Sequence, residues 1–384
     1  MSNTLPILLF TLIAAVATAA FAGPATAAAA QESLPVLPLA VEPGPSIPTV
    51  ARRAALPSEW SESLRLEISR GGSAPLVWFE SGILVASLDR NVHLVSLDGP
   101  RVVWKENYRG GFEAEPVVTE DRIYLSETRR GARLLALDRD SHRTLWTADA
   151  GDLMAPPILT EERLYTVSSI GEVKAFDRAG VLQWSTELGS RVQAGAALLD
   201  GVLVIAASDG HFYAVDTEDG AVRESTDPGV GFVWGNPLVR AHPATAVFAT
   251  LDGLLVEVDA DLEVIQQRSF PSRFTVGPDQ VGGDLLLIGH EGTVWRYDWE
   301  GASVVWHREL PATLRSAPRV SSEVVALGSL EGILYLLDLA SGETLWETRL
   351  DGAITSRPLA RELEFFAFTE SGTLYGFRPA GSAR

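Results

Sequence analysis

A short phrase recurs along this chain at a nearly constant interval. In each copy an alternating apolar run ends in Asp, as in "RLLALD" at Asp138 and "ILYLLD" at Asp338. Successive intervals are 40, 39, 39, 43, 39, 40 and 40 residues. A fixed period of this size indicates a repeat architecture, in which each repeat is one supersecondary unit. The copies end at Asp98, Asp138, Asp177, Asp216, Asp259, Asp298, Asp338 and Arg378.

Within each repeat the pattern is that of β-strands. Apolar and polar residues alternate with period two, and turns such as Asp209-Gly210 and Asp252-Gly253 separate the runs. Each repeat has room for four short strands. Eight four-stranded antiparallel units predict an all-β fold, an eight-bladed β-propeller.

The two ends of the repeat region complement each other. The last copy stops after the strand "TLYGF", whereas "EWSESLRLEIS" (59–69) supplies a strand before the first full repeat. Ring closure removes exposed sheet edges. We therefore expect the N-terminal strand to complete the last blade, so that residues 59–380 form the propeller.

A tryptophan follows the repeated Asp in five of the copies. A buried tryptophan removes roughly 150–250 Å² from water, which favours a structural role in docking neighbouring blades. The copies that end at Asp216 and Asp259 lack this tryptophan, at Glu224 and at Ile265/Gln266. The predicted blade-docking residues are Trp104, Trp146, Trp184, Trp306 and Trp346.

The first 58 residues differ from the repeats. No charged residue precedes Glu32, and residues 5–22 are an apolar run followed by small residues. We interpret residues 1–30 as an export signal, with an uncleaved membrane anchor as the alternative. Residues 31–58 are rich in Pro and Ala and are expected to form an extended linker. The chain is thus expected in the periplasm or cell envelope, and without cysteine it forms no disulfide.

Charge and motifs exclude several function classes. A net charge of −19 disfavours nucleic-acid binding, because phosphates would be repelled. The six histidines lie in different repeats without metal-ligand spacing, and no G-x-S-x-G motif occurs. We expect no catalytic residue, no bound cofactor and no metal site.

The residues just before the first strand of each blade should line one rim of the central channel. Aromatic and arginine side chains there would suit protein recognition. The stretch "PGVGFVWGNP" (228–237) is the most distinctive of these segments, since it sets two aromatics among glycines. The candidate partner-binding residues are Phe112, Glu113, Phe232, Trp234, Leu314 and Arg315.

The phrase "LLDLASGETLW" and its weaker copies "ALDRDSHRTLW" and "AVDTEDGAVRE" resemble the pyrroloquinoline-quinone-like propeller repeat. One branch of that superfamily, BamB, implies a monomeric, non-enzymatic envelope scaffold that assists outer-membrane protein assembly and contacts a POTRA-bearing barrel protein. The chain departs from that branch because it lacks a lipid-anchoring cysteine and the "LRGES" loop. The alternative is a funnel that binds a quinone or a sugar, as in the quinoprotein dehydrogenases, although their cysteine pair is absent.

Overall fold

The computed structural model describes residues 37–38, 56–128 and 132–381. Leu34–Arg384 form one compact unit. The predicted export signal (1–30) and most of the predicted linker lie outside the described residues. Within the described part of the chain, no helix is long and apolar enough to cross a membrane.

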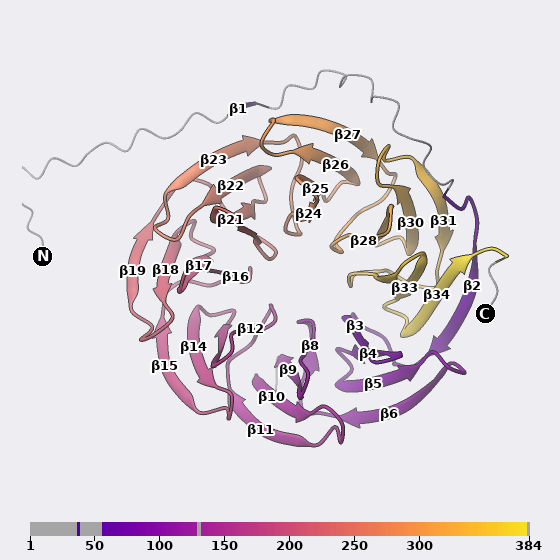
Figure 1. The fold of residues 1–384 in the computed structure, drawn as a ribbon, viewed down its shortest axis with the longest axis horizontal. Helices are drawn as coiled ribbons and strands as arrows, with labels where there is room; N and C mark the ends of the chain where they lie inside the picture. Colours follow the sequence, from indigo (N-terminus) through magenta and orange to yellow (C-terminus); the bar gives the residue numbers. More distant parts are fainter. Residues whose placement is uncertain (1–36, 39–55, 129–131, 382–384) are drawn as a thin grey trace, which may run out of the picture. The chain divides into compact units, whose positions relative to one another are not determined.

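Eight antiparallel sheets are arranged around a central axis, as predicted, and form an eight-bladed propeller (Figure 1). In Figure 1 the strands of each blade follow one another from the axis outward. Blade 1 consists of β3 (Leu76–Phe79), β4 (Gly82–Ala86), β5 (Asn91–Ser96) and β6 (Arg101–Asn107). Blade 2 consists of β7 (Gly111–Phe112), β8 (Val117–Val118), β9 (Arg122–Thr128), β10 (Arg133–Asp138) and β11 (Thr144–Asp149). Blade 3 consists of β12 (Ile158–Leu159), β13 (Arg163–Val167), β14 (Glu172–Asp177) and β15 (Leu182–Glu187). Blade 4 consists of β16 (Ala196–Leu199), β17 (Val202–Ala206), β18 (Phe212–Asp216) and β19 (Val222–Thr226).

The remaining blades follow the same order. Blade 5 consists of β20 (Leu238–Ala241), β21 (Ala244–Ala249), β22 (Leu254–Val258) and β23 (Val264–Ser269). Blade 6 consists of β24 (Asp279–Val281), β25 (Asp284–Ile288), β26 (Thr293–Asp298) and β27 (Ser303–Glu309). Blade 7 consists of β28 (Arg319–Ser321), β29 (Val324–Gly328), β30 (Ile333–Asp338) and β31 (Thr344–Arg349). Blade 8 consists of β32 (Leu359–Arg361), β33 (Glu364–Phe368), β34 (Thr373–Pro379) and β2 (Trp60–Glu67).

The N-terminal strand closes the ring. β2 pairs antiparallel with β34, from Trp60 opposite Pro379 to Glu67 opposite Thr373. The outer edge of blade 8 is therefore formed by residues from the opposite end of the repeat region. A second contact from the N-terminal side is the two-residue strand β1 (Leu37–Pro38), which pairs in parallel with β23.

The repeated Asp ends the third strand of a blade and shapes the turn that follows. The Asp338 carboxylate accepts hydrogen bonds from the backbone N–H groups of Ala340 (2.7 Å) and Ser341 (2.9 Å). Asp177 accepts one from Ala179 at 2.8 Å. Such Asx turns satisfy backbone donors where the chain reverses. The register between the two outer strands shifts by one residue shortly before this turn in every blade.

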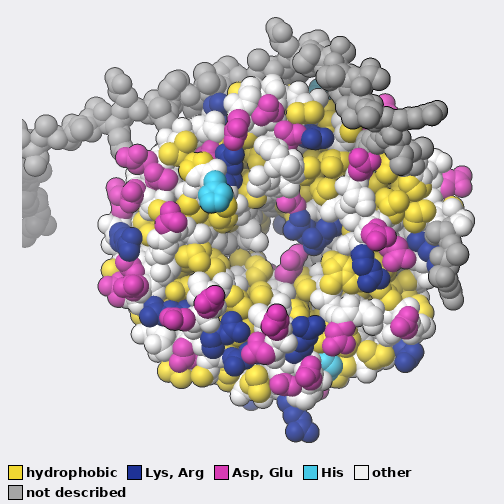
Figure 2. All heavy atoms as spheres, viewed as in Figure 1, with side chains coloured by type: hydrophobic (Ala, Val, Ile, Leu, Met, Phe, Trp, Pro, Cys, Tyr) yellow, Lys and Arg dark blue, Asp and Glu magenta, His cyan; other side chains and the backbone are white. Residues whose placement is uncertain are grey.

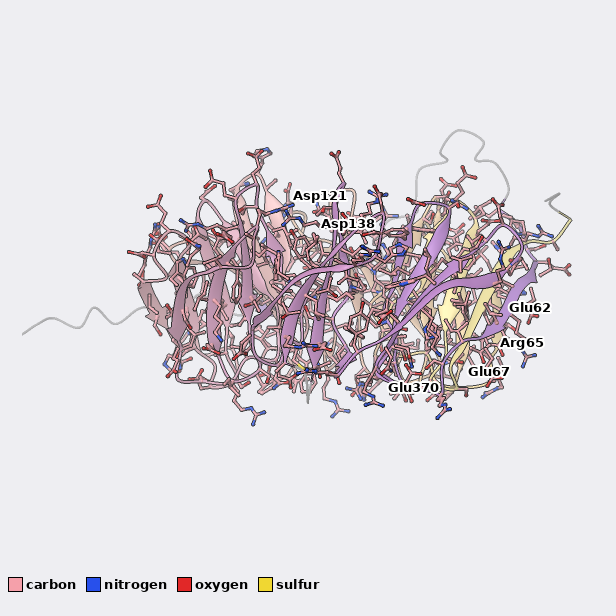
Figure 3. All side chains as sticks on the ribbon, turned by 90° about the horizontal axis from the view of Figure 1, so that it is seen from below. Glu62, Arg65, Glu67, Asp121, Asp138 and Glu370 are labelled. Atoms are coloured by element: carbon pink, nitrogen blue, oxygen red, sulfur yellow. The ribbon has the colours of Figure 1, made fainter. Side chains whose placement is uncertain are left out.

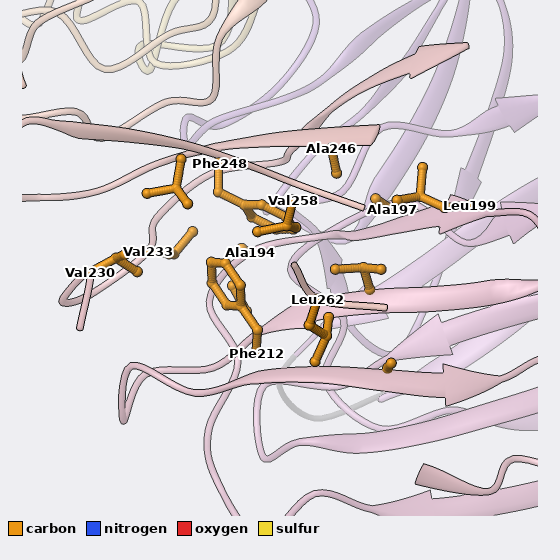
Figure 4. Close-up of a cluster of buried hydrophobic side chains, with 14 of the residues drawn as sticks. Ala194, Ala197, Leu199, Phe212, Val230, Val233, Ala246, Phe248, Val258 and Leu262 are labelled. Carbon is orange, nitrogen blue, oxygen red and sulfur yellow. The ribbon is translucent and has the colours of Figure 1, made fainter. Parts of the chain in front are cut away.

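The hydrophobic core lies between neighbouring blades. The cluster between blades 4 and 5 contains Phe212 and Phe248, whose ring centroids are 4.9 Å apart (Figure 4). Similar clusters join the other blades, for example Leu286 of blade 6 with Leu337 of blade 7. Each blade is therefore stabilised by its neighbours, and the ring buries a nearly continuous apolar belt.

The two faces of the ring carry different turns. The turns between the second and third strands lie on one face, called here the rim face, which includes Glu370. The turns after the repeated Asp lie on the opposite face, which includes Asp138 (Figure 3).

Candidate functional site

Three of the predicted docking tryptophans reach the next blade with the same hydrogen bond. The indole Nε1–H groups of Trp146, Trp184 and Trp306 donate to backbone carbonyls of the following blade. The acceptors are Arg178 (3.0 Å), Thr217 (3.1 Å) and Leu339 (2.9 Å), respectively.

A glycine with positive φ covers each of these three indole rings. A Cβ atom added to Gly180, Gly220 or Gly342 would lie 2.5 Å from an atom of Trp146, Trp184 or Trp306, respectively. The φ angles are 82°, 77° and 71°. Glycine is required at these positions on two grounds, since it adopts this conformation without strain and leaves room for the indole.

The other two predicted tryptophans have different neighbours. The ring centroids of Trp104 and His142 of blade 2 lie 4.5 Å apart, with the ring planes tilted by 33°. His142 takes the place of the motif glycine, with φ 58°. Trp346 lies 6.2 Å from Trp60 and 5.2 Å from Phe377 in the closing blade.

At the two interfaces that lack this tryptophan, a large side chain of the following blade fills the space instead. Leu262 takes the glycine position of blade 5 with φ 60°, and its buried side chain packs against blade 4. At the next interface, the indole of Trp299 is buried and donates to Glu257 at 2.6 Å. The sequence analysis missed Trp299, and the signal that could have found it is a tryptophan directly after the repeated Asp298.

Glu257 is the most heavily coordinated buried acid among the described residues. Besides Trp299, it accepts hydrogen bonds from Thr245 (2.5 Å), Gln266 (2.9 Å) and Arg240 (3.0 Å). Burial tends to raise the pKa of Glu257, but these donors outweigh it and leave the pKa below its usual value. Glu257 therefore fixes blade 5 to blade 6 as a charged carboxylate.

The rim face of the ring is organised by one repeated backbone hydrogen bond. In blade 5, the Leu251 N–H donates to the Phe232 carbonyl at 2.9 Å, and in blade 6 the His290 N–H donates to Arg273 at 2.8 Å. Corresponding bonds join the pairs Leu88–Ser73, Ser169–Asp152, Ser208–Arg191, Leu330–Thr313 and Glu370–Ala353. In these seven blades the segment before the innermost strand is thereby fixed to the rim, and in blade 2 the pairing of β7 with β9 does the same.

One residue in each of these segments is apolar and buried, and two of the predicted contact residues belong to this set. Phe112 and Leu314 are fully buried because they pair with the end of a second strand, at Glu127 and Ser329. Their side chains therefore pack inside the ring and are unavailable to a partner. The equivalent residues are Ala74, Leu153, Val192, Val233, Phe274 and Ile354.

The other four predicted residues reach the surface or the channel. Glu113 and Trp234 line the channel mouth, Phe232 is half-buried, and Arg315 is exposed. The Phe232 and Trp234 ring centroids lie 5.7 Å apart. The fold thus brings together Phe232 and Trp234, whereas Arg315 does not line the channel.

Glycines shape the loop that carries this aromatic pair. Gly231 and Gly235 have φ angles of 73° and 88°. A Cβ atom on Gly235 would lie 2.5 Å from the backbone nitrogen of Gly277 in the next blade. The loop therefore packs directly on blade 6, and this contact holds Trp234 at the channel mouth.

The channel mouth forms a cavity of about 400 Å³. Figure 2 shows the ring hollowed at its centre, with basic and acidic side chains at the edge of the opening. Residues from blades 2 to 8 contribute to its wall. The lining includes the side chains of Glu113, Glu115, Met154, Gln193, Trp234, Asp279 and Arg357.

Charged residues of blades 6, 7 and 8 meet beside this cavity. Arg357 forms an ion pair with Asp279 and also donates to the Pro318 carbonyl at 2.7 Å. Arg319 donates to the Pro358 carbonyl at 3.1 Å. The pKa of Arg319 is lowered, mainly by burial and also by the positive charge of Arg357. The negative charges of Glu115 and Asp279 oppose this shift but do not cancel it.

The sequence analysis missed Asp279 and Arg319. Both directly follow the proline that opens a blade, where five other blades carry an apolar residue. The charged residue directly after the proline is the sequence signal that could have found them. Among the residues that the structure describes, no group of three or more His, Asp or Glu is arranged to hold a metal ion.

The fold and the repeat define the class of protein first: an eight-bladed propeller of the pyrroloquinoline-quinone-like type. A family model described as "Outer membrane protein assembly factor BamB" matches residues 58–162, 85–227, 169–264 and 263–384, and the chain belongs to this family.

Known proteins of the family are distant in sequence. The outer membrane protein assembly factor BamB of Burkholderia pseudomallei is 23% identical over 320 residues, which cover 77% of this chain and 82% of that protein. The crystal structure of BamB from Moraxella catarrhalis has a TM-score of 0.67 at 16% identity and covers 83% of this chain and 100% of its own.

The same fold also occurs in an enzyme. The quinohemoprotein alcohol dehydrogenase ADHIIG of Pseudomonas putida HK5 has a TM-score of 0.67 at 11% identity, covering 85% of this chain and 77% of its own. The fold alone therefore does not decide between a scaffold and an enzyme.

Proposed function

We propose that this chain is a non-catalytic protein-interaction scaffold of the cell envelope that assists the assembly of outer-membrane proteins. Its membership of the BamB family over residues 58–384 supports this assignment. A POTRA-bearing barrel protein is the expected partner, and the predicted export signal at residues 1–30 would deliver the chain to the same compartment.

The aromatic pair at the channel mouth is the observation that carries the proposal. Phe232 and Trp234 are half-buried on a loop that packs on the neighbouring blade. A large aromatic side chain that is already held in place binds at a low cost in conformational entropy. Glu113 and the exposed Arg315 add charged groups to the same face, and such groups orient a partner more than they strengthen its binding.

A crosslinked pull-down of the tagged, exported protein from its native envelope tests the proposal. We expect recovery of a POTRA-bearing barrel protein, and a large loss of recovery for Trp234→Ala and for Arg315→Glu. Val181→Ala is a suitable control, because Val181 is exposed (57%) in a turn that follows a repeated Asp on the opposite face. Equal recovery with Trp234→Ala and Val181→Ala would contradict the rim assignment, and no enriched envelope protein would contradict the scaffold function.

The channel cavity favours a second candidate function, the binding of a quinone or a sugar. Trp234 and Arg357 both line the cavity, where an indole can stack on a planar molecule and a guanidinium can hydrogen-bond to an anionic group. An absorbance spectrum recorded after incubation with pyrroloquinoline quinone and calcium tests this function. Retention of the quinone through gel filtration, and its loss in Arg357→Met, would support it.

A further inference from the structure

A groove runs along the outer surface of the ring between blades 1 and 2. Its walls are the end of β6 with the segment after it, from Trp104 to Arg109, and the turn and strand start at 141–144. The Tyr108 N–H donates to the carbonyl of Arg90, in the rim-face turn of blade 1, at 2.8 Å. The groove thus extends from the turn after Asp138 toward the rim face, and it encloses about 680 Å³.

This interface departs from the repeat in a way that the fold does not require. At three other interfaces a glycine covers the tryptophan, and the indole donates to a backbone carbonyl. Here His142 replaces the glycine in the left-handed conformation (φ 58°), which is unfavourable for a residue with a side chain. Within the described residues no acceptor binds Trp104 Nε1, so this donor is available to a ligand.

The groove is basic although the chain is strongly acidic. Arg109, Arg133 and Arg143 line it, together with the single acid Glu106. Arg133 pairs with Glu127 at 2.7 Å. Arg109 and Arg143 are exposed, and no acid among the described residues lies within ion-pair distance of their guanidinium groups.

A second outer groove on the ring provides a contrast. The groove between blades 3 and 4 is lined by Glu161, Glu162, Glu218 and Asp219. Its one arginine, Arg163, donates to the carbonyls of Thr217 (2.6 Å) and Glu218 (2.8 Å). The guanidinium of the blade 3–4 groove is thus held by backbone carbonyls, whereas those of Arg109 and Arg143 have no such partner among the described residues. On a protein with a net charge of −19, an acidic ligand is repelled over most of the surface and attracted here.

We propose that the blade 1–2 groove binds an extended, acidic segment of a protein partner. Carboxylates of that segment pair with Arg109 and Arg143, a backbone carbonyl accepts from Trp104 Nε1, and an apolar side chain packs on the Trp104 and His142 rings. The wall from Trp104 to Arg109 is six residues long, so an extended partner segment of about six residues, roughly 20 Å, would lie along the groove. This surface is separate from the channel mouth, and it rests on the proposed function only in that the partner is a protein.

Fluorescence anisotropy with the purified protein tests the proposal. The probe is a rhodamine-labelled peptide of seven residues in which Glu and Val alternate, and the matched peptide carries Gln in place of Glu. We expect saturable binding of the Glu peptide that weakens with salt, and binding of the Gln peptide that is at least about tenfold weaker.

Two double variants separate the groove from the overall charge of the protein. Arg109→Glu/Arg143→Glu should weaken binding by at least about tenfold. Arg101→Glu/Lys105→Glu is the matched control, because both residues are exposed on β6, carry the same charge and do not line the groove. Equal weakening by the two double variants would overturn the proposal, as would no binding of the Glu peptide at about 1 mM.

His142→Gly provides a test that does not alter the arginines. It restores the motif glycine, so the turn can approach Trp104 as at the other interfaces and narrow the groove. We expect weaker peptide binding with an unchanged or higher melting temperature. Unchanged affinity would contradict the role of the Trp104–His142 contact. Equally tight binding of a short polyphosphate would reassign the groove to polyanions. Recovery of the POTRA-bearing protein in the pull-down depends on the channel mouth, so the two proposals can fail separately.

Discussion

Gly342→Ala tests the docking of blade 6 on blade 7. The added Cβ atom would lie 2.5 Å from Trp306 Cε3 and 2.7 Å from Cδ2, distances that real contacts do not reach. The residue also has φ 71°, a conformation that costs an L-residue roughly 1–2 kcal/mol. Displacing the indole adds about 1–3 kcal/mol of overpacking. The substitution should therefore lower the free energy of unfolding by about 2–5 kcal/mol.

A matched glycine isolates the contribution of the indole. Gly189 has a similar φ of 77°, but a Cβ atom added there would meet nothing within 4 Å. Gly189→Ala should cost only the backbone strain, about 1–2 kcal/mol. The difference between the two alanine variants measures the contact with Trp306.

The assay is urea-induced unfolding of the purified protein, followed by tryptophan fluorescence and by circular dichroism so that a deviation from two-state behaviour is detected. A double-mutant cycle with Trp306→Ala completes the test. In that background Gly342→Ala should cost no more than Gly189→Ala, since the indole is gone. If Gly342→Ala costs no more than Gly189→Ala in the native background, or if its excess cost persists without Trp306, the docking argument is refuted.

Two further predictions concern other interfaces. Trp346→Ala should cost about 3–5 kcal/mol by opening the contact with Trp60 in the closing blade, and an unchanged melting temperature would contradict this role. Glu257 has a lowered pKa, so its stabilising effect is complete above its ordinary value of 4.5 and is lost as pH falls through the lower pKa of the folded state. Glu257→Gln should therefore lower the free energy of unfolding at pH 7 and make it fall less steeply as the pH is lowered. Parallel curves of unfolding free energy against pH for the two proteins would contradict this role of Glu257.

The repeated Asp and its spacing were sufficient to predict the blades, because in six of them this Asp caps the turn after the third strand. The closing strand could be predicted as well, since β2 and β34 are complementary halves of one unit. The repeat period could not predict that a large residue of one blade replaces the tryptophan missing from the blade before it. Trp299 and Leu262 lie one blade beyond the missing tryptophan, and only the packing shows that they occupy the same space.

The candidate site was predicted less well for a different physical reason. Successive side chains of an extended segment point to opposite sides. An error of one position in the prediction therefore exchanges buried side chains for accessible ones. Phe112 is buried whereas its neighbour Glu113 lines the channel. The pairing of Arg357 with Asp279 joins blades 8 and 6 across the channel wall, and sequence spacing carries no information about such a contact.

The closing strand also sets the order of events when the ring forms. β2 is synthesised before any full blade, and its partner β34 is synthesised after all of them. Pairing Glu67 with Thr373 therefore spans almost the entire repeat region, and contacts of such large sequence separation form slowly. Until then blade 8 has an open edge, and its apolar clusters with blades 7 and 1 lack Trp60 and Leu64 of β2, which favours aggregation. We expect the unclosed ring to be the form of this protein that most depends on chaperones.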